Sequence, residues 1–70
     1  MFNREELEKA IKASGLNDGF IANEIGISYD LFSKKKAGVT EWKLKEVQKL
    51  CRVLRLRKTD AIKIFPLKVN

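Results

Sequence analysis

A compact all-α bundle of four or five short helices is the fold that this 70-residue sequence predicts. One local pattern recurs four times: an apolar residue, a capping residue, and a second apolar residue four positions after the cap. This is a hydrophobic staple around an N-cap, which determines where a helix begins. A later stretch repeats apolar residues at steps of three and four, the spacing of one helix face. No segment has a convincing strand pattern.

The four staples place the helix starts. They are Phe2-Asn3-Leu7, Leu16-Asn17-Ile21, Ile27-Ser28-Phe32 and Val39-Thr40-Leu44. Asn3 and Glu6 also fit a capping box. The staples predict helices over about residues 4–13, 18–25, 29–36 and 41–55. A fifth helix is predicted over about residues 58–64 and should stop before Pro66, because the residue before a proline favours extended backbone.

These helices predict which side chains form the core. The inward positions are Leu7, Ala10, Ile11, Ile21, Ala22, Ile25, Phe32, Leu44, Val47, Leu50, Cys51, Leu54, Leu56, Ala61, Ile62 and Phe65. At Cys51 a small buried hydrophobe is a better interpretation than a reactive thiol.

Length and composition indicate a single domain, predicted over residues 1–65, followed by a short C-terminal tail over residues 66–70. One cysteine excludes an intramolecular disulfide and favours a reducing compartment. No apolar run approaches the roughly 20 residues that span a membrane, and the acidic N-terminus does not resemble a signal peptide. We therefore expect a cytoplasmic protein with no membrane partner.

The net charge of +6 is unevenly distributed. Residues 13–27 carry −2, whereas residues 43–58 hold seven Lys or Arg and one Glu. Such a field attracts a polyanion, although a solvated helix face that keeps a small protein soluble is the alternative. An exposed ridge is predicted at Lys45, Lys49, Arg52 and Arg55. We expect it to attract polyanions in a general way and to keep the protein soluble, and the second option is that it binds an acidic partner.

One stretch has the residue order of two helices joined by a tight turn. Ala22 is small where the helices would cross, and Gly26 fits a left-handed helix end. Ile27 would plug the turn, and Ser28 would cap a second helix that carries three consecutive lysines, residues 34–36. This order predicts a helix-turn-helix, the unit that places one helix in the DNA major groove.

The run F-I-A-N-E-I-G-I-S-Y-D-L-F, followed by L-K-E-V-Q-K-L-C-R-V-L-R-L, resembles the phage repressor and Cro-type helix-turn-helix family. This family is also called the xenobiotic-response-element family, and the resemblance covers about residues 5–65. The resemblance implies that the chain has a lambda-repressor-like fold and that it is a transcription regulator of a phage or mobile element. Such a protein binds duplex DNA sequence-specifically, usually as a dimer on a near-palindromic operator, in a bacterial cell or the host of a phage.

The sequence departs from this family at three positions. Asp18 stands where the family commonly has a glutamine that touches a DNA phosphate, and a carboxylate there would repel the phosphate. Lys35 and Lys36 stand where the family often has an apolar residue followed by glutamate. The alkyl stems of these lysines can cover the core while the ammonium groups reach water or phosphate.

Base reading is expected from the outward side chains of the third helix, which are Tyr29, Asp30, Ser33 and Lys34. Lys34 could donate to guanine O6 or N7, Asp30 could accept from cytosine N4, and Tyr29 could touch a thymine methyl or a phosphate. The alternatives are that Tyr29 only shields the turn and that Asp30 only stabilises the helix N-terminus.

Phosphate contacts are expected near the helix ends, at Asn17, Ser28, Lys35, Lys36, Thr40 and Lys43, together with backbone N–H groups at the start of the fourth helix. Capping alone is the alternative for Thr40. Trp42 is expected to pack against the third helix rather than stack on a sugar or a partner.

The C-terminal apolar residues Ile64, Phe65, Leu67 and Val69 need a cover. They could fold back on the first helix. They could instead pair with a second copy in a homodimer through the fifth helix and the tail, which would also use Ile62. The sequence leaves both arrangements open.

An enzyme is not expected. The chain has no histidine, one cysteine, no phosphate-binding glycine loop and no metal-ligand cluster, so neither a cofactor nor a metal is predicted. The alternative to DNA binding is a protein-binding modulator or anti-repressor of the same fold, which pairs with another repressor. Asp18 and the apolar tail would suit this alternative better.

Overall fold

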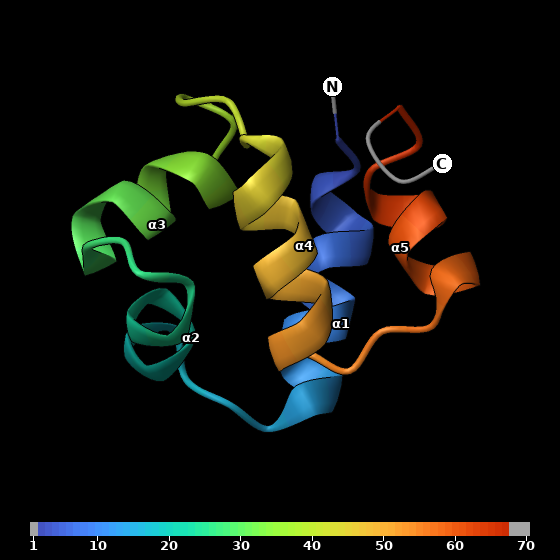
Figure 1. The fold of residues 1–70 in the computed structure, drawn as a ribbon, viewed down its shortest axis with the longest axis horizontal. Coiled ribbons are helices and arrows are strands. Elements are labelled where there is room, and N and C mark those ends of the chain that lie inside the picture. Colours follow the sequence, from blue (N-terminus) through green and yellow to red (C-terminus); the bar gives the residue numbers. More distant parts are fainter. Residues whose placement is uncertain (1, 68–70) are drawn as a thin grey trace.

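The computed structural model describes residues 2–67 and has five α-helices and no strand within them. The helices are α1 (Arg4–Ser14), α2 (Asp18–Ile25), α3 (Tyr29–Lys36), α4 (Leu44–Val53) and α5 (Lys58–Ile64). Figure 1 shows α4 through the middle of the bundle, with α2 and α3 on one side and α5 on the other. The predicted all-α fold is confirmed. No helix in the described part of the chain has the length and apolar character needed to cross a membrane.

Three of the four predicted N-caps are confirmed. Asn3 Oδ1 accepts from the N–H of Glu6 (3.1 Å), Asn17 Oδ1 from that of Phe20 (2.8 Å), and Ser28 Oγ from that of Leu31 (3.1 Å). Each bond satisfies an N–H group that the first helical turn leaves without a partner. The capping box at Asn3 is only half formed, because its own N–H donates to the carbonyl of Ile64 (2.8 Å). The start of α1 is thereby bonded to the end of α5.

The prediction of the fourth staple, at Val39, Thr40 and Leu44, is wrong. Helix α4 begins at Leu44 with Lys43 as its N-cap residue, and Thr40 does not cap it. Val39 and Leu44 are 74% and 52% exposed. Backbone N–H groups of Val39 and Thr40 instead bond the carbonyl of Lys34, which extends the turn after α3.

Trp42 occupies the core where the staple was expected. It is buried and meets Phe32 of α3 edge to face, with ring centroids 6.0 Å apart. The predicted packing of Trp42 against the third helix is confirmed. An indole buries far more apolar surface than a valine or leucine, which explains why Trp42 takes the core position and α4 begins later than predicted.

Apart from Trp42 and Ile64, the buried core consists of side chains that were predicted to point inward. Its buried apolar members are Leu7, Ile11, Ile21, Ala22, Ile25, Phe32, Trp42, Val47, Leu50, Leu54, Ala61, Ile64 and Phe65. Ala10, Cys51 and Leu56 are half-buried against them. The prediction is wrong for Leu44 and for Ile62, which is 39% exposed. Burial raises the pKa of the Cys51 thiol, as expected of a packing residue.

The end of α5 folds back on the N-terminal segment. Phe65 is buried, stacks on Phe2 with centroids 5.8 Å apart, and meets Trp42 edge to face. Ile64 is equally buried. Of the two arrangements that the sequence left open for Ile64 and Phe65, the structure shows the fold-back, because this chain's own core covers both side chains. Leu67 is exposed, and the predicted role of Val69 lies outside the described residues.

Candidate nucleic-acid interface

Helices α2 and α3 are joined by a three-residue turn, Gly26–Ser28. The carbonyl of Ala22 accepts from the N–H groups of both Gly26 and Ile27, each at 3.0 Å. Gly26 has φ 87°, in the left-handed region that a side chain disfavours. Ala22 is buried where the chain turns back, so the predicted local roles of Ala22 and Gly26 are confirmed.

The outward face of α3 carries the four residues predicted to read bases. Tyr29, Asp30 and Lys34 are exposed and Ser33 is half-buried. Their spacing places them side by side on one helix face, since residues three and four apart are neighbours. The opposite face is buried at Phe32 and Lys35.

Lys35 is directed into the protein. Its side chain is only 2% exposed, and its Nζ lies 2.7 Å from Glu46 Oε1 and donates to the carbonyl of Glu41, also at 2.7 Å. The ammonium stands 5.9 Å from the centroid of the Trp42 ring. The prediction that Lys35 contacts phosphate is wrong, because a buried ammonium needs partners inside the protein and has them.

The surroundings of Glu46 favour the charged carboxylate that the Lys35 ammonium needs as its partner. Burial alone would raise the pKa of Glu46, but hydrogen bonds from Lys35 and from the N–H of Lys43, with the nearby positive charge, hold that pKa below its ordinary value. The N–H of Lys43 reaches Glu46 Oε1 at 2.9 Å. The backbone N–H of Lys43 belongs to the predicted phosphate site at the start of α4, and the protein's own Glu46 carboxylate already accepts its hydrogen bond.

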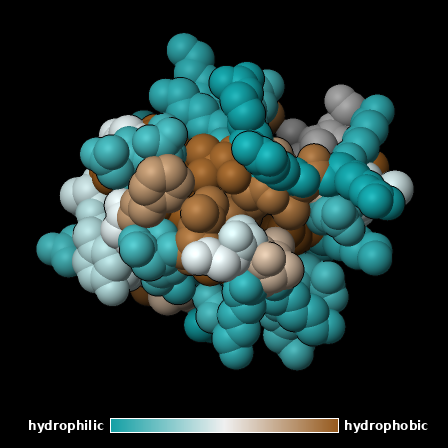
Figure 2. All heavy atoms as spheres, turned by 90° about the horizontal axis from the view of Figure 1, so that it is seen from below, coloured by the Kyte–Doolittle hydropathy of each residue, from teal (hydrophilic) through white to brown (hydrophobic). Residues whose placement is uncertain are grey.

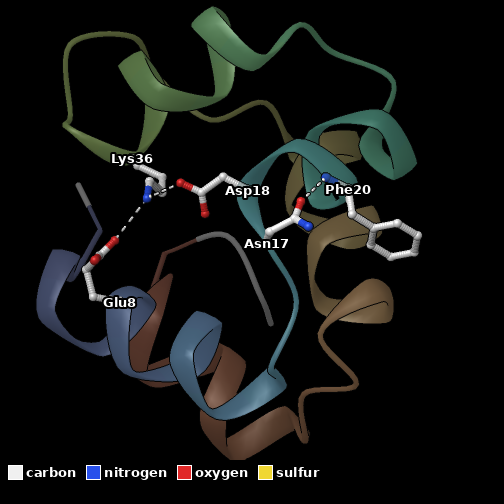
Figure 3. Close-up of polar contacts among 5 residues, drawn as sticks. All are labelled: Glu8, Asn17, Asp18, Phe20 and Lys36. Carbon is white, nitrogen blue, oxygen red and sulfur yellow. Dashed lines mark hydrogen bonds and ion pairs between the residues drawn. The ribbon is translucent and has the colours of Figure 1, made fainter.

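Lys36 joins three helices. Its Nζ lies 2.7 Å from Asp18 Oδ2 at the start of α2 and 3.3 Å from Glu8 Oε1 on α1 (Figure 3). Burial acts to lower the pKa of Lys36, but the hydrogen bonds and charges of Asp18 and Glu8 outweigh it and raise that pKa. A phosphate could reach this ammonium only in competition with two carboxylates. The same ion pair neutralises the Asp18 carboxylate, whose negative charge was expected from the sequence to repel a DNA phosphate.

The other predicted phosphate contacts lie nearer the surface. Asn17, Ser28 and Lys43 are exposed and Thr40 is half-buried. The Asn17 Oδ1 atom (Figure 3) and the Ser28 Oγ atom accept capping bonds, which leaves the Asn17 Nδ2 group and the Ser28 hydroxyl proton as possible donors.

Sequence reasoning missed Glu8 and Glu46, the carboxylates that bind Lys36 and Lys35. Both pairs join residues on different helices, so no local spacing marks them. A signal did exist for Glu46, because it lies three residues after the cap at Lys43, where a capping glutamate is common. The misplaced start of α4 concealed it.

Within residues 2–67 no group of three or more His, Cys, Asp or Glu side chains could hold a metal ion. Comparisons of this chain with protein-family models, with curated proteins and with solved structures gave no match. The surface of α3 and the residues that hold this helix in place are therefore the features from which a function can be inferred.

Proposed function

We propose that this protein is a sequence-specific duplex-DNA-binding transcription regulator that places α3 in the major groove. The observation that carries the proposal is the outward face of α3, where Lys34 is exposed beside Tyr29, Asp30 and Ser33. Among the described residues Lys34 forms no ion pair, whereas both lysines after it do. The regulator would be of the phage or mobile-element repressor or Cro type and would act in the bacterial cytoplasm.

The chemistry of this face suits base edges. An ammonium at Lys34 can donate to guanine O6 or N7, and a carboxylate at Asp30 can accept from cytosine N4. The Tyr29 ring can contact a thymine methyl group. Exposed Asn17, Ser28 and Lys43 offer donors to phosphates on either side, which would set the register of the helix.

The buried contacts of the last turn of α3 support the proposal in a second way. Lys35 bonds this turn to the start of α4, and Lys36 bonds it to α2 and α1. A recognition helix held from two sides loses little freedom on binding, so less of the contact energy is spent on ordering it.

Selection from randomised duplexes over a series of salt concentrations tests the proposal. We expect one sequence motif to be enriched and the affinity to fall steeply with salt, because phosphate contacts release counterions. Absence of any enriched motif near physiological salt would refute sequence-specific binding. Lys45→Ala, on the exposed ridge of α4, is the control that should preserve the motif.

The second candidate is a protein-binding modulator or anti-repressor of the same fold. Two observations favour it: the ammonium groups of Lys35 and Lys36 are engaged by carboxylates, and Val39 and Leu44 expose apolar surface beside α3. Tight binding to a repressor protein, in a preparation that enriches no DNA motif, would select this function instead.

A further inference from the structure

A groove crosses the end of the molecule where α1 and α4 terminate. It consists of two adjoining hollows of ≈ 580 Å³ and ≈ 340 Å³, which share Ser14, Leu54 and Arg55. Figure 2 views this end of the molecule and shows an apolar floor surrounded by hydrophilic side chains. Leu54 and Leu56 line this part of the groove. An apolar depression with a polar rim is the usual form of a surface that contacts another protein.

The larger hollow has an acidic edge and a basic edge. Glu24 of α2 lines one side, and Arg52 of α4 and Arg55 just beyond that helix line the other. Among the described residues these three side chains form no ion pair, either with one another or with a neighbour. The groove therefore offers unpaired charges of opposite sign to an occupant that lies between its two edges.

We propose that this groove binds an amphipathic helix of another protein. Two hollows that meet at Leu54 suit two apolar side chains about one helical turn apart, the anchor pattern of a helix in a groove. Phe20, which is 47% exposed, would cover the anchor in the larger hollow. A basic side chain on one edge of the bound helix would meet Glu24, and an acidic side chain on its other edge would meet Arg52 and Arg55.

The charge of the groove favours a protein over a nucleic acid. Its charged lining residues are three acidic and three basic, namely Glu6, Glu24, Asp60, Lys9, Arg52 and Arg55. The groove is thus neutral in a chain whose net charge is +6. Because a polyanion binds through an excess of positive charge, this end of the molecule offers it little attraction. An apolar floor gains instead from covering by apolar side chains.

A second copy of this chain does not provide such a helix within its described residues. The large apolar side chains that are exposed there are Phe20, Tyr29, Val39, Leu44, Ile62 and Leu67. Four of them lie in helices, and each of these four belongs to a different helix. No helix in residues 2–67 therefore presents two exposed apolar anchors one turn apart, so the occupant belongs to a different protein.

The backbone at Arg55 supports a role for its side chain. Arg55 has φ 54°, and among the described residues it alone has a positive φ without being glycine. The N–H of Leu56 bonds the carbonyl of Cys51 (2.9 Å), as in the helix end where glycine is most common. The chain keeps a long basic side chain on the groove wall at a position that glycine would occupy with less strain.

Selection of helical peptides with randomised surface positions against the full chain tests this proposal, which does not depend on DNA binding. We expect the enriched peptides to share two large apolar residues three or four positions apart, with a basic residue on one edge and an acidic residue on the other. Fluorescence anisotropy should show that Glu24→Arg and Arg52→Glu each weaken binding of an enriched peptide by about tenfold or more, because each places like charges opposite one another.

A peptide with exchanged charge separates direct contact from general attraction. When its acidic edge is changed to lysine, the peptide should bind Arg52→Glu more tightly than it binds the original chain. General attraction cannot produce this result, because the Arg52→Glu protein still has a net positive charge and repels a more basic peptide. The recovery would also show that Arg52→Glu is folded.

Two further variants complete the design. Lys45→Glu makes the same charge change on α4 outside the groove and should bind the enriched peptide like the original chain. Arg55→Gly should weaken binding without lowering the melting temperature, because it relieves the backbone while removing a groove contact.

Four results would each overturn the proposal. The selection could enrich no peptide, or only uniformly acidic ones, as general attraction to a basic protein would do. The exchanged peptide could fail to recover binding to Arg52→Glu, or Lys45→Glu could weaken binding equally. Sedimentation could instead show a dimer of the original chain that Glu24→Arg dissociates, and the occupant would then be a second copy.

Discussion

The ammonium of Lys35 lies 2.7 Å from the carboxylate of Glu46 and joins the last turn of α3 to the first turn of α4. Their side chains are only 2% and 14% exposed. This pair turns a residue of the basic run on α3 into an internal support for that helix. It also explains why the loop from Ala37 to Lys43 follows its observed path, since Lys35 donates to the carbonyl of Glu41 within it.

Removing one member of this pair should destabilise the protein more than removing both. Glu46→Ala leaves a buried ammonium without its counter-ion and should reduce the free energy of unfolding by about 3–5 kcal/mol. The double variant Lys35→Met/Glu46→Leu should recover most of that loss, because apolar side chains replace both charges. Urea denaturation followed by circular dichroism measures both values. A double variant as unstable as Glu46→Ala would contradict this account.

The acid dependence of stability should include a contribution from Glu46. Because the folded protein holds the pKa of Glu46 below its ordinary value, the carboxylate stabilises the fold at pH values above about 4.3, the pKa expected in the unfolded chain. This stabilisation should be lost as the pH falls toward the folded pKa. Unfolding free energies measured across this acid range should decline less steeply in Glu46→Gln. Glu5→Gln, at an exposed position, is the control, and an equal effect from it would contradict the assignment.

The two carboxylates that bind Lys36 should contribute unequally. Asp18 is closer to the ammonium and less exposed than Glu8, whose side chain is 55% exposed. A double-mutant cycle with Asp18→Ala and Lys36→Ala should give a coupling energy of about 1 kcal/mol, whereas solvent and salt should reduce the Glu8 coupling to a few tenths. Thermal or urea unfolding of the variants measures these values. Stronger coupling to Glu8 would mean that the contact with Asp18 is not the dominant one in solution.

Lys34 and Lys43 should affect DNA binding in different ways. Lys34→Ala should lose preference at one base pair, worth about 1–3 kcal/mol, with other positions of the motif unchanged. Lys43→Ala should weaken binding to all duplexes alike and reduce the salt slope by about one. Affinities for duplexes with single base-pair changes distinguish the two results. If Lys34→Ala weakened all sequences uniformly, Lys34 would contact phosphate instead of a base.

Two glycines of the α2 region should respond to alanine with opposite signs. Gly26→Ala should destabilise the fold by about 1–2 kcal/mol, because a Cβ at φ 87° is strained even though the space around it is open. Gly19→Ala should stabilise the fold by up to about 1 kcal/mol, because Gly19 lies inside α2 and the added Cβ would make only an ordinary contact, 3.4 Å from Asn17 Oδ1. Melting temperatures of the two variants provide the comparison.

Most helix starts and the inner faces of the helices could be predicted from the sequence. The caps at Asn3, Asn17 and Ser28 depend on bonds that span three residues, so nearby sequence contains the information. The exposure of Tyr29, Asp30 and Lys34 followed from helix periodicity for the same reason. The start of α4 was missed because Val39 and Leu44 match a local pattern as well as any true staple.

The sequence by itself determined the all-α fold, the turn at Gly26 and the outward position of Lys34, since these depend on backbone preferences and on neighbours within about one helical turn. Only the tertiary structure decided that Phe65 stacks on Phe2 of the same chain and that Lys35 and Lys36 are held by Glu46, Asp18 and Glu8. Burial and ion pairing are competitions among residues far apart in the chain, and the winner depends on which side chains the fold brings together. For that reason three consecutive lysines, alike in sequence, have three different environments.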